Sequence, residues 1–289
     1  MSKSISNEFI AALDNYKLST KDRDEINRLI SYSQNQPPVL EDIWMSMDLV
    51  WDELRCDNKI PNAECMRDFY RHPVWFLNGI FIEKDKISIQ HRHAISDWIT
   101  VHNNSIKRVL DYGGGFGTLG RLIAEKNPEL QIDIFEPCPS KYAIVSSRQF
   151  TNINFIKELN LAANLQFECL AAIDVLEHLG DPLETLDDMI RITRINGHLL
   201  IANNFFPVIK CHLPRNFHFR FSFPLFAKMM GLKRIGVCLG SHATIYKKVA
   251  NHPQNWNKIR KVETISQMIF PILLILETSY RHLKKWATS

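Results

Sequence analysis

The sequence predicts a doubly wound α/β fold, in which helices cover both faces of a mostly parallel sheet. Between residues 106 and 202, short apolar runs alternate with helical segments, which is the pattern of parallel strands joined by crossover helices. Glycines crowd residues 113–117, between the first strand and the helix after it. Three regions are therefore expected: a helical N-terminal cap region (1–100), the α/β core (101–250) and a C-terminal amphipathic helix (251–289).

The cap region is predicted to be mostly helical. Apolar residues recur at helical spacing in three stretches, at 21–33, 39–55 and 88–102. The segment 72–89, between the second and third stretches, is rich in aromatic and β-branched residues. Such residues favour strands, so we expect extended structure there.

Within the core, residues 106–111 predict the first strand and 131–135 the second. Helix 118–126 lies between them. Three more apolar runs predict further strands, at 153–156, 167–173 and 197–202.

The end of the core differs from its beginning. Asp181 precedes Pro182, and Glu184 follows three residues after the aspartate, which is the signature of a capped helix start. Residues 204–232 combine Phe, Pro and basic residues and are expected to form a substrate-side insertion. Residues 233–248 predict a closing hairpin.

Charge is distributed unevenly along the chain. The net charge is +4, but residues 207–289 hold 14 Lys or Arg and two acids, giving +12 there and −8 in the rest. A basic segment of this kind suits an anionic substrate, a membrane surface or nucleic acid, or simply forms a solvated face. The six cysteines are scattered without a Cys-x-x-Cys pair, and the first residues contain no apolar run. We therefore expect reduced thiols and a cytoplasmic protein.

The glycine run is the strongest chemical signal. Glycine allows a tight turn close to a ligand, and the helix that follows presents free N–H groups. Gly115-x-Gly117-x-x-Gly120 also fits the dinucleotide pattern, so a nicotinamide-dependent oxidoreductase is an alternative. Asp111, just before the glycines, favours a cationic ligand over a pyrophosphate. Glu136, which ends the second strand, can accept hydrogen bonds from ribose hydroxyls.

A second motif, Phe167-Glu-Cys-Leu-Ala-Ala-Ile-Asp174-Val-Leu-Glu177-His178-Leu179, follows at the fourth predicted strand. With the glycine run, it resembles the class I S-adenosylmethionine-dependent methyltransferases, in particular the small-molecule branch that includes the ubiquinone-biosynthesis O-methyltransferases. The resemblance covers about residues 106–203, with a weaker echo at 218–224. It implies a Rossmann-like, mostly parallel seven-stranded sheet and S-adenosylmethionine as cofactor.

The resemblance also implies the cofactor-binding residues, which are Asp111, Gly113, Gly115, Gly117, Glu136 and Asp174. The family often has an acidic residue after the third strand that contacts the adenine amine. No residue of the corresponding stretch, 155–160, fits that role. The adenine contacts therefore stay unassigned.

Catalysis is harder to assign. Methyl transfer is an in-line displacement for which the protein mainly aligns donor and acceptor. His178, just past the fourth strand, is the candidate general base; alternatively, Glu177 and His178 only fix the loop. Asp174, Glu177 and His178 offer ligands for a divalent metal only with a further ligand, so we expect no metal site.

The acceptor is expected to be a small molecule, methylated at oxygen and anionic or lipid-linked. Its predicted contacts are His212, Arg215, His218 and Arg220. Nucleic acid is not expected as a partner, because Asn203-Asn204-Phe205-Phe206 lacks the prolines of a base-flipping Asn-Pro-Pro-Tyr motif. A non-catalytic subunit that binds the cofactor remains an alternative.

The C-terminal helix has an apolar run of eight residues, 269–276, with basic residues on both sides within 258–286. It is too short to span a bilayer, which needs about 20 residues. It can lie on an anionic membrane surface, pack on the N-terminal helices, or mediate a homodimer.

Overall fold

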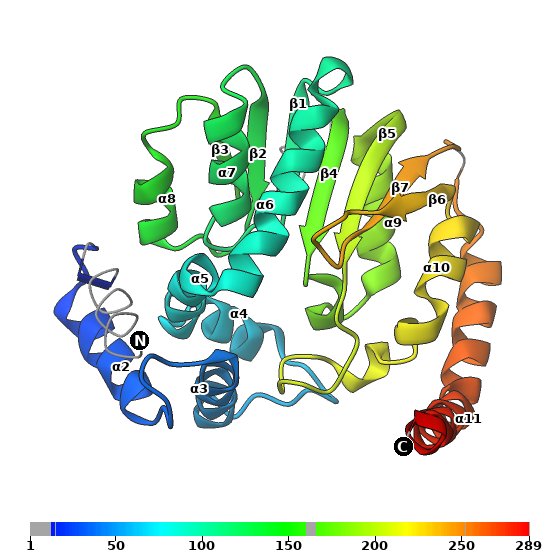
Figure 1. Cartoon of the computed structure of the whole chain (residues 1–289), viewed down its shortest axis with the longest axis horizontal. Coiled ribbons are helices and arrows are strands. Elements are labelled where there is room, and N and C mark those ends of the chain that lie inside the picture. The colour runs from blue at the N-terminus through cyan, green and yellow to red at the C-terminus, as the bar shows by residue number, and fades with distance from the viewer. Residues whose placement is uncertain (1–12, 15, 160–165, 252, 289) are drawn as a thin grey trace.

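A computed structural model describes residues 13–14, 16–159, 166–251 and 253–288. Its centre is a seven-stranded sheet in the order β3-β2-β1-β4-β5-β7-β6 (Figure 1). Strands β1 to β5 run parallel, and β7 is antiparallel to both β5 and β6. The predicted fold class and the closing hairpin are confirmed. The strands are β1 (Arg108–Tyr112), β2 (Gln131–Phe135), β3 (Ile153–Ile156), β4 (Phe167–Ile173), β5 (Thr193–Ala202), β6 (Leu232–Val237) and β7 (Thr244–Lys248).

Helices cover both faces of the sheet. In β4, Cys169 and Ala171 pack with α6 (Lys86–Val101) and α7 (Thr118–Lys126). Leu170 and Ala172 face the opposite way, toward α9 (Pro182–Ile192) and α10 (Phe219–Met229). Because neighbouring strand residues point to opposite faces, a continuously apolar strand fits this doubly covered position. One short helix, α8 (Lys141–Ser147), follows β2.

The start of α9 has the predicted cap. The Asp181 carboxylate accepts hydrogen bonds from the N–H groups of Leu183 and Glu184, at 3.1 and 3.0 Å. Pro182 occupies the first turn, where no N–H is needed.

In its described part, the cap region contains α2 (Thr20–Ser31), α3 (Leu40–Glu53), α4 (Ala63–Arg71) and α5 (Val74–Lys84), and α6 follows directly. The prediction of extended structure at 72–89 is therefore wrong. Almost every apolar side chain of α5 is buried, including Phe76, Leu77 and Ile80. Tertiary burial on all sides thus outweighs the β-propensity of these residues.

These helices lie against the carboxyl ends of the parallel strands, and Figure 1 shows α2 to α5 gathered on that side of the sheet. Phe116, within the glycine run, belongs to the same apolar cluster as Phe76 and Leu77 of α5. On α8, the Tyr142 hydroxyl donates to Asp22 at 2.7 Å. The cap region is therefore joined to the loops where ligands of open α/β sheets bind.

Two cysteines depart from the expected reduced state. Cys56 and Cys65 form a disulfide between the loop after α3 and the start of α4. Their Cα atoms lie 5.7 Å apart, within the range that a disulfide needs. This proximity arises from the turn between two helices, which no cysteine-spacing rule predicts. The other four cysteines are free.

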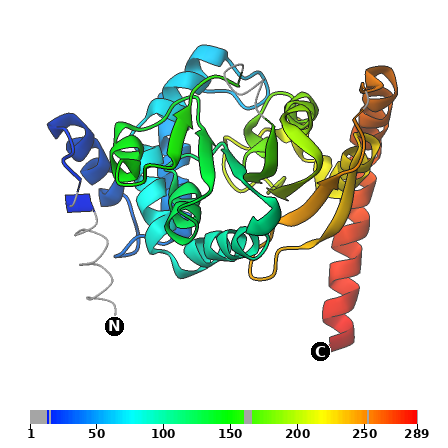
Figure 2. The same ribbon diagram turned by 90° about the horizontal axis from the view of Figure 1, so that it is seen from above.

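The last helix, α11 (Trp256–Thr288), runs along the outer edge of the molecule beside α10 (Figure 2). Its end extends beyond the body of the sheet and its covering helices. Among the described helices, none combines the length and the apolar character needed to cross a bilayer. The described residues also include the 3₁₀ turns η1 (Asn103–Ser105), η3 (Leu176–His178) and η4 (Pro214–Asn216).

Candidate functional site

The glycine run turns tightly at the carboxyl end of β1. Gly113, Gly115 and Gly117 have φ values of +68°, +53° and +76°. Residues that carry a Cβ atom rarely adopt such values. A Cβ atom at Gly113 would lie 2.7 Å from a methyl group of Val175. The turn therefore requires glycine and brings backbone N–H groups close to the ends of β2 and β4.

Asp111 lies beneath this turn with an exposure of 3%. Its Oδ2 atom has no hydrogen-bond partner among the described residues. Burial raises the pKa of this carboxyl group to about 7, although the Arg92 guanidinium acts in the opposite direction. A buried acid without a partner suits a cationic ligand, which would stabilise its charged form.

Arg92, on α6, is the nearby cation. Burial lowers the pKa of its guanidinium group, while Asp174 and Asp111 raise it. Its only described hydrogen bond is to the Ser88 carbonyl oxygen, at 3.0 Å. Arg92 therefore lies between the carboxyl ends of β1 and β4 with further N–H groups able to bind an anion.

Glu136 ends β2 as predicted. Its two carboxylate oxygens accept hydrogen bonds from the N–H groups of Gly115 and Cys138, both at 3.0 Å. Burial raises the pKa of this group. The backbone thus fixes the carboxylate beside the glycine run, and each oxygen keeps a lone pair for another donor.

Asp174 follows β4 with a φ of +55°. Its Oδ1 atom lies 3.2 Å from Nε2 of His242, in the loop between β6 and β7. Burial alone would raise the pKa of this carboxyl, but the hydrogen bond and charge of His242 lower it overall. His242 Nδ1 in turn lies 3.0 Å from Nδ1 of His91 on α6.

A second group of polar side chains lies on η3 and on the loop that precedes η4. Glu177 is fully buried; its Oε1 accepts from the Asn204 N–H at 2.7 Å, while Oε2 has no partner among the described residues. Burial, reinforced by Asp174, raises its pKa to about 8. The His178 and His212 rings meet edge to face, with centroids 4.7 Å apart.

The two histidines are held as neutral rings. Burial, with a smaller effect of His212, lowers the pKa of His178 to about 3, and burial also lowers that of His212. Backbone carbonyl oxygens fix one nitrogen of each ring, Cys211 for His178 at 3.3 Å and Phe206 for His212 at 2.8 Å. The remaining nitrogens are left for a proton or a ligand.

These three side chains also form a possible metal-binding set. Ligand atoms of Glu177, His178 and His212 all lie within 4.8 Å of one another. Neutral imidazoles suit a divalent metal, but a carboxyl group with a pKa near 8 must first lose its proton. Asp174, which the sequence placed in such a set, is paired with His242 instead.

Aromatic residues of the cap region form a wall over this group. The rings of Tyr70 and Trp75 lie 5.0 Å apart and meet the His178 ring at 6.3 and 6.2 Å. Both the Tyr70 hydroxyl and the Trp75 indole N–H are buried without a partner among the described residues. The carboxylates of Glu136 and Glu177 are close enough to raise the pKa of Tyr70 further, beyond the effect of burial.

Comparison with known proteins agrees with this geometry. Residues 87–217 match the profile of a family described as a methyltransferase domain. These residues are a methyltransferase domain. The seven-stranded sheet agrees with a core of class I, for which the methyltransferase match supports S-adenosylmethionine as the cofactor. No curated protein sequence matches the chain.

Two solved structures are similar to this methyltransferase in fold. An O-methyltransferase family protein from Burkholderia thailandensis is 14% identical, with 78% of this chain and 77% of that one covered and a TM-score of 0.52. A mitomycin 7-O-methyltransferase is 12% identical, with 79% and 72% covered and a TM-score of 0.51. Both coverages exceed the length of the core, so the likeness includes part of the flanking helical regions.

The predicted acceptor contacts of the methyltransferase lie in three different places. His212 lies against His178. His218 and Arg220 lie between α10 and α11, where His218 contacts Ser266 at 2.9 Å and Arg220 pairs with Glu277. Arg215 is exposed on η4, close enough to lower the pKa of His218 slightly.

Sequence reasoning missed Tyr70, Trp75 and Arg92. Tyr70 and Trp75 lie about a hundred residues from His178 in the chain, and only the docking of the cap region brings them together. Arg92 did carry a signal, as the arginine on the helix that directly precedes the first strand of the core.

Proposed function

We propose that this methyltransferase O-methylates a small, ring-containing molecule held between the cap region and the carboxyl end of the sheet. The observation that carries the proposal is the cluster of buried, unpartnered polar atoms on Tyr70, Trp75 and Glu177 beside His178. Buried polar groups without partners cost about 1–3 kcal/mol each. A ligand that pairs with all three would therefore bind strongly and specifically.

The chemistry of the cluster favours a hydroxyl-bearing ring. Two aromatic side chains offer a flat apolar wall, and their O–H and N–H groups are donors for acceptor oxygens. Glu177, protonated at neutral pH because its pKa is about 8, is a third donor through its free oxygen. Such a donor-rich site fits a ring with several oxygens, as in a sugar or a hydroxylated aromatic compound.

We propose that different side chains bind different parts of the cofactor. Glu136 would accept from the ribose hydroxyls, while the buried carboxylate of Asp111 would face the cationic methionine end. The guanidinium of Arg92 would bind the methionine carboxylate, since arginine binds carboxylates through two N–H groups. The glycine run, Gly113 to Gly117, would let the backbone approach the cofactor.

The reaction would be a direct displacement. The acceptor oxygen attacks the methyl carbon as the bond from sulfur to that carbon breaks, leaving a methyl ether, S-adenosylhomocysteine and one proton. His178 would take that proton on its free nitrogen. Its low pKa of about 3 keeps the ring neutral and ready at physiological pH. A weak base suffices, because the newly methylated oxygen is a strong acid until it loses its proton.

Methylation assays with a panel of hydroxylated ring compounds test the proposal through the release of S-adenosylhomocysteine. With any accepted compound, Tyr70→Phe and Trp75→Phe should raise KM about tenfold or more, because each removes a hydrogen-bond donor worth about 1.5 kcal/mol. Affinity for the cofactor should not change. Tyr32→Phe, at a tyrosine that is 52% exposed, is the matched control.

Three results would contradict the proposal. Parent KM values in both variants would place the acceptor elsewhere. An exclusive preference for amine acceptors would replace the oxygen assignment. Cofactor binding without methyl transfer to any compound would favour the alternative of a non-catalytic binding subunit.

A further inference from the structure

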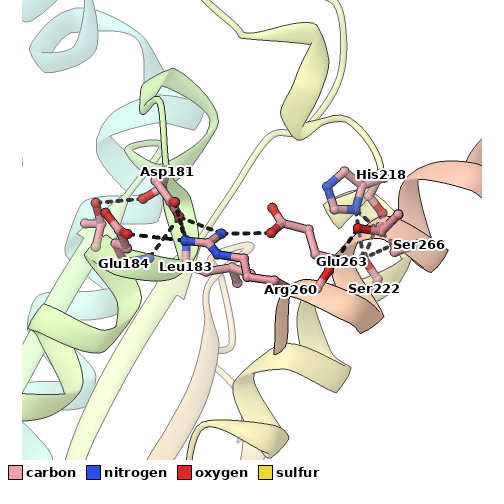
Figure 3. A network of polar contacts seen from close by, with 10 residues as sticks. Asp181, Leu183, Glu184, His218, Ser222, Arg260, Glu263 and Ser266 are labelled. Atoms are coloured by element: carbon pink, nitrogen blue, oxygen red, sulfur yellow. Dashed lines mark hydrogen bonds and ion pairs between the residues drawn. The ribbon is translucent and has the colours of Figure 1, made fainter. Parts of the chain in front are cut away.

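The inner face of α11 is fixed to the core, as Figure 3 shows. Arg260 reaches across to Asp181, the cap of α9, and to Glu263 on its own helix. One turn further on, the Ser266 hydroxyl lies 2.9 Å from Nδ1 of His218 and donates to Ser222 at 2.8 Å. These contacts set the rotation of the helix about its axis.

The outer face of α11 carries an uninterrupted aliphatic stripe. Successive members are separated by three, one, three, three and one residues, which places them on one side of a helix, within an arc of roughly 120°. Each is between 43% and 71% exposed. From residue 264 to residue 276 the sequence contains no charged side chain. The stripe consists of Ile265, Met268, Ile269, Ile272, Ile275 and Leu276.

No other element of the described chain covers this stripe. Figures 1 and 2 both place α11 at the edge of the molecule, with one side turned away from the rest of the fold. Contiguous apolar surface of this kind usually marks a binding face. It contrasts with the inner face, where Ile259 is 2% exposed and Ser266 is 6% exposed.

Positive charge stands at the N-terminal end of the stripe. Lys258 and Lys261 are exposed and precede Ile265 by seven and four residues, which places them on the stripe's side of the helix. Arg281, Lys284 and Lys285 follow it in the sequence.

The acids of α11 do not offset this charge on the outer face. Glu263 pairs with Arg260, and Glu277 pairs with Arg220 of α10. The stripe therefore has two exposed lysines at its N-terminal end, without nearby compensating carboxylates on its own helix.

This charge pattern distinguishes between two possible partners of the stripe, a second copy of α11 and a lipid surface. Two copies of α11 paired in parallel would place Lys258 and Lys261 of one copy against those of the other. An antiparallel pair would bring them toward residues 281–285 of the second copy, which hold three basic residues and no acid. Repulsion between like charges disfavours either arrangement. An anionic lipid surface, in contrast, accepts the aliphatic side chains and attracts lysines and arginines at the headgroup level.

We propose that α11 is a membrane-surface helix, which lies in the plane of an anionic bilayer with its stripe buried among the acyl chains. The contacts of Arg260 and Ser266 then hold the methyltransferase core at the lipid surface. This inference is independent of the proposed acceptor site, because it rests on α11 alone.

Vesicle sedimentation of the full-length protein tests the proposal. It should sediment with vesicles that contain an anionic phospholipid, and about tenfold less with purely zwitterionic vesicles. Replacing Met268, Ile272 and Ile275 together by Gln should lower binding to the anionic vesicles by tenfold or more. Lys258→Gln with Lys261→Gln should weaken binding mainly at low salt, because surface charges are screened by ions.

A matched control replaces three aliphatic residues of similar exposure outside α11: Ile60, Ile87 and Val101, each at least 66% exposed. This variant should bind vesicles like the parent protein. Unchanged affinity for S-adenosylhomocysteine in all variants shows that they are folded. Absence of sedimentation by the parent, or equal losses in stripe and control variants, would overturn the proposal. A dimer in the ultracentrifuge that the stripe variant dissociates would assign the face to a second copy instead.

Discussion

The buried carboxyl group of Asp111 makes cofactor binding depend on pH. Its pKa of about 7 in the free protein results mainly from burial. S-adenosylmethionine carries a sulfonium and an ammonium group, and S-adenosylhomocysteine keeps the ammonium. A cation beside the carboxyl favours its ionised form. Binding should therefore release the proton that Asp111 holds at acid pH.

The size of the effect follows from that pKa. The ionised fraction of Asp111 is about one half at pH 7, one in eleven at pH 6 and one in a hundred at pH 5. If only the ionised form binds the cofactor, affinity falls about fivefold from pH 7 to 6 and about fiftyfold from pH 7 to 5. These losses correspond to about 1 and about 2.3 kcal/mol. The cofactor's ammonium stays charged throughout, since α-amino groups have pKa values of about 7.7–8.0.

Calorimetric titration with S-adenosylhomocysteine between pH 5 and 7.5 measures this dependence. Repeating it in buffers of different ionisation enthalpy counts the released protons. Asp111→Asn, which cannot ionise, should bind more weakly at pH 7 and lose the dependence attributable to this group. Affinity that is constant from pH 5 to 7 in the parent protein, or an unchanged pH profile in Asp111→Asn, would refute the reasoning.

Three further outcomes are expected. Glu136→Ala should lower affinity for S-adenosylhomocysteine by about ten- to a hundredfold, through the loss of charge-assisted hydrogen bonds, with an unchanged circular dichroism spectrum. Gly113→Ala, which combines a positive φ with a contact of 2.7 Å to Val175, should destabilise the fold by about 1–3 kcal/mol in thermal unfolding. Arg220→Ala should leave acceptor KM unchanged but speed proteolysis of α11, because its partner is Glu277; a raised KM alone would restore its predicted role in acceptor binding.

Local signals predicted the core well. The helix at 118–126 and the strand at 131–135 were predicted with the bounds that the structure has, because glycine turns and alternating apolar runs mark both ends. The cap of α9 followed from Asp181 and Pro182 for the same reason. Where neighbouring residues alone determine the bounds of a helix or strand, those bounds can be predicted from the sequence.

Long-range packing explains the failures. The aromatic segment 74–84 is helical because it is buried on nearly every side, and its composition does not reveal that environment. The aromatic wall over His178 depends on Tyr70 meeting His178 across the cap and the core. His218 and Arg220, which the sequence predicts as acceptor contacts, also bind residues of α11, which comes much later in the chain.

The central claim is that the core binds S-adenosylmethionine, and equilibrium titration of the purified protein tests it most directly. S-adenosylhomocysteine should bind with a micromolar dissociation constant, equivalent to about −8 kcal/mol. NAD should show no comparable binding, because the carboxyl group of Asp111 lies beneath the glycine run, where it would repel a pyrophosphate. Tight binding of NAD together with no response to S-adenosylhomocysteine would contradict the account.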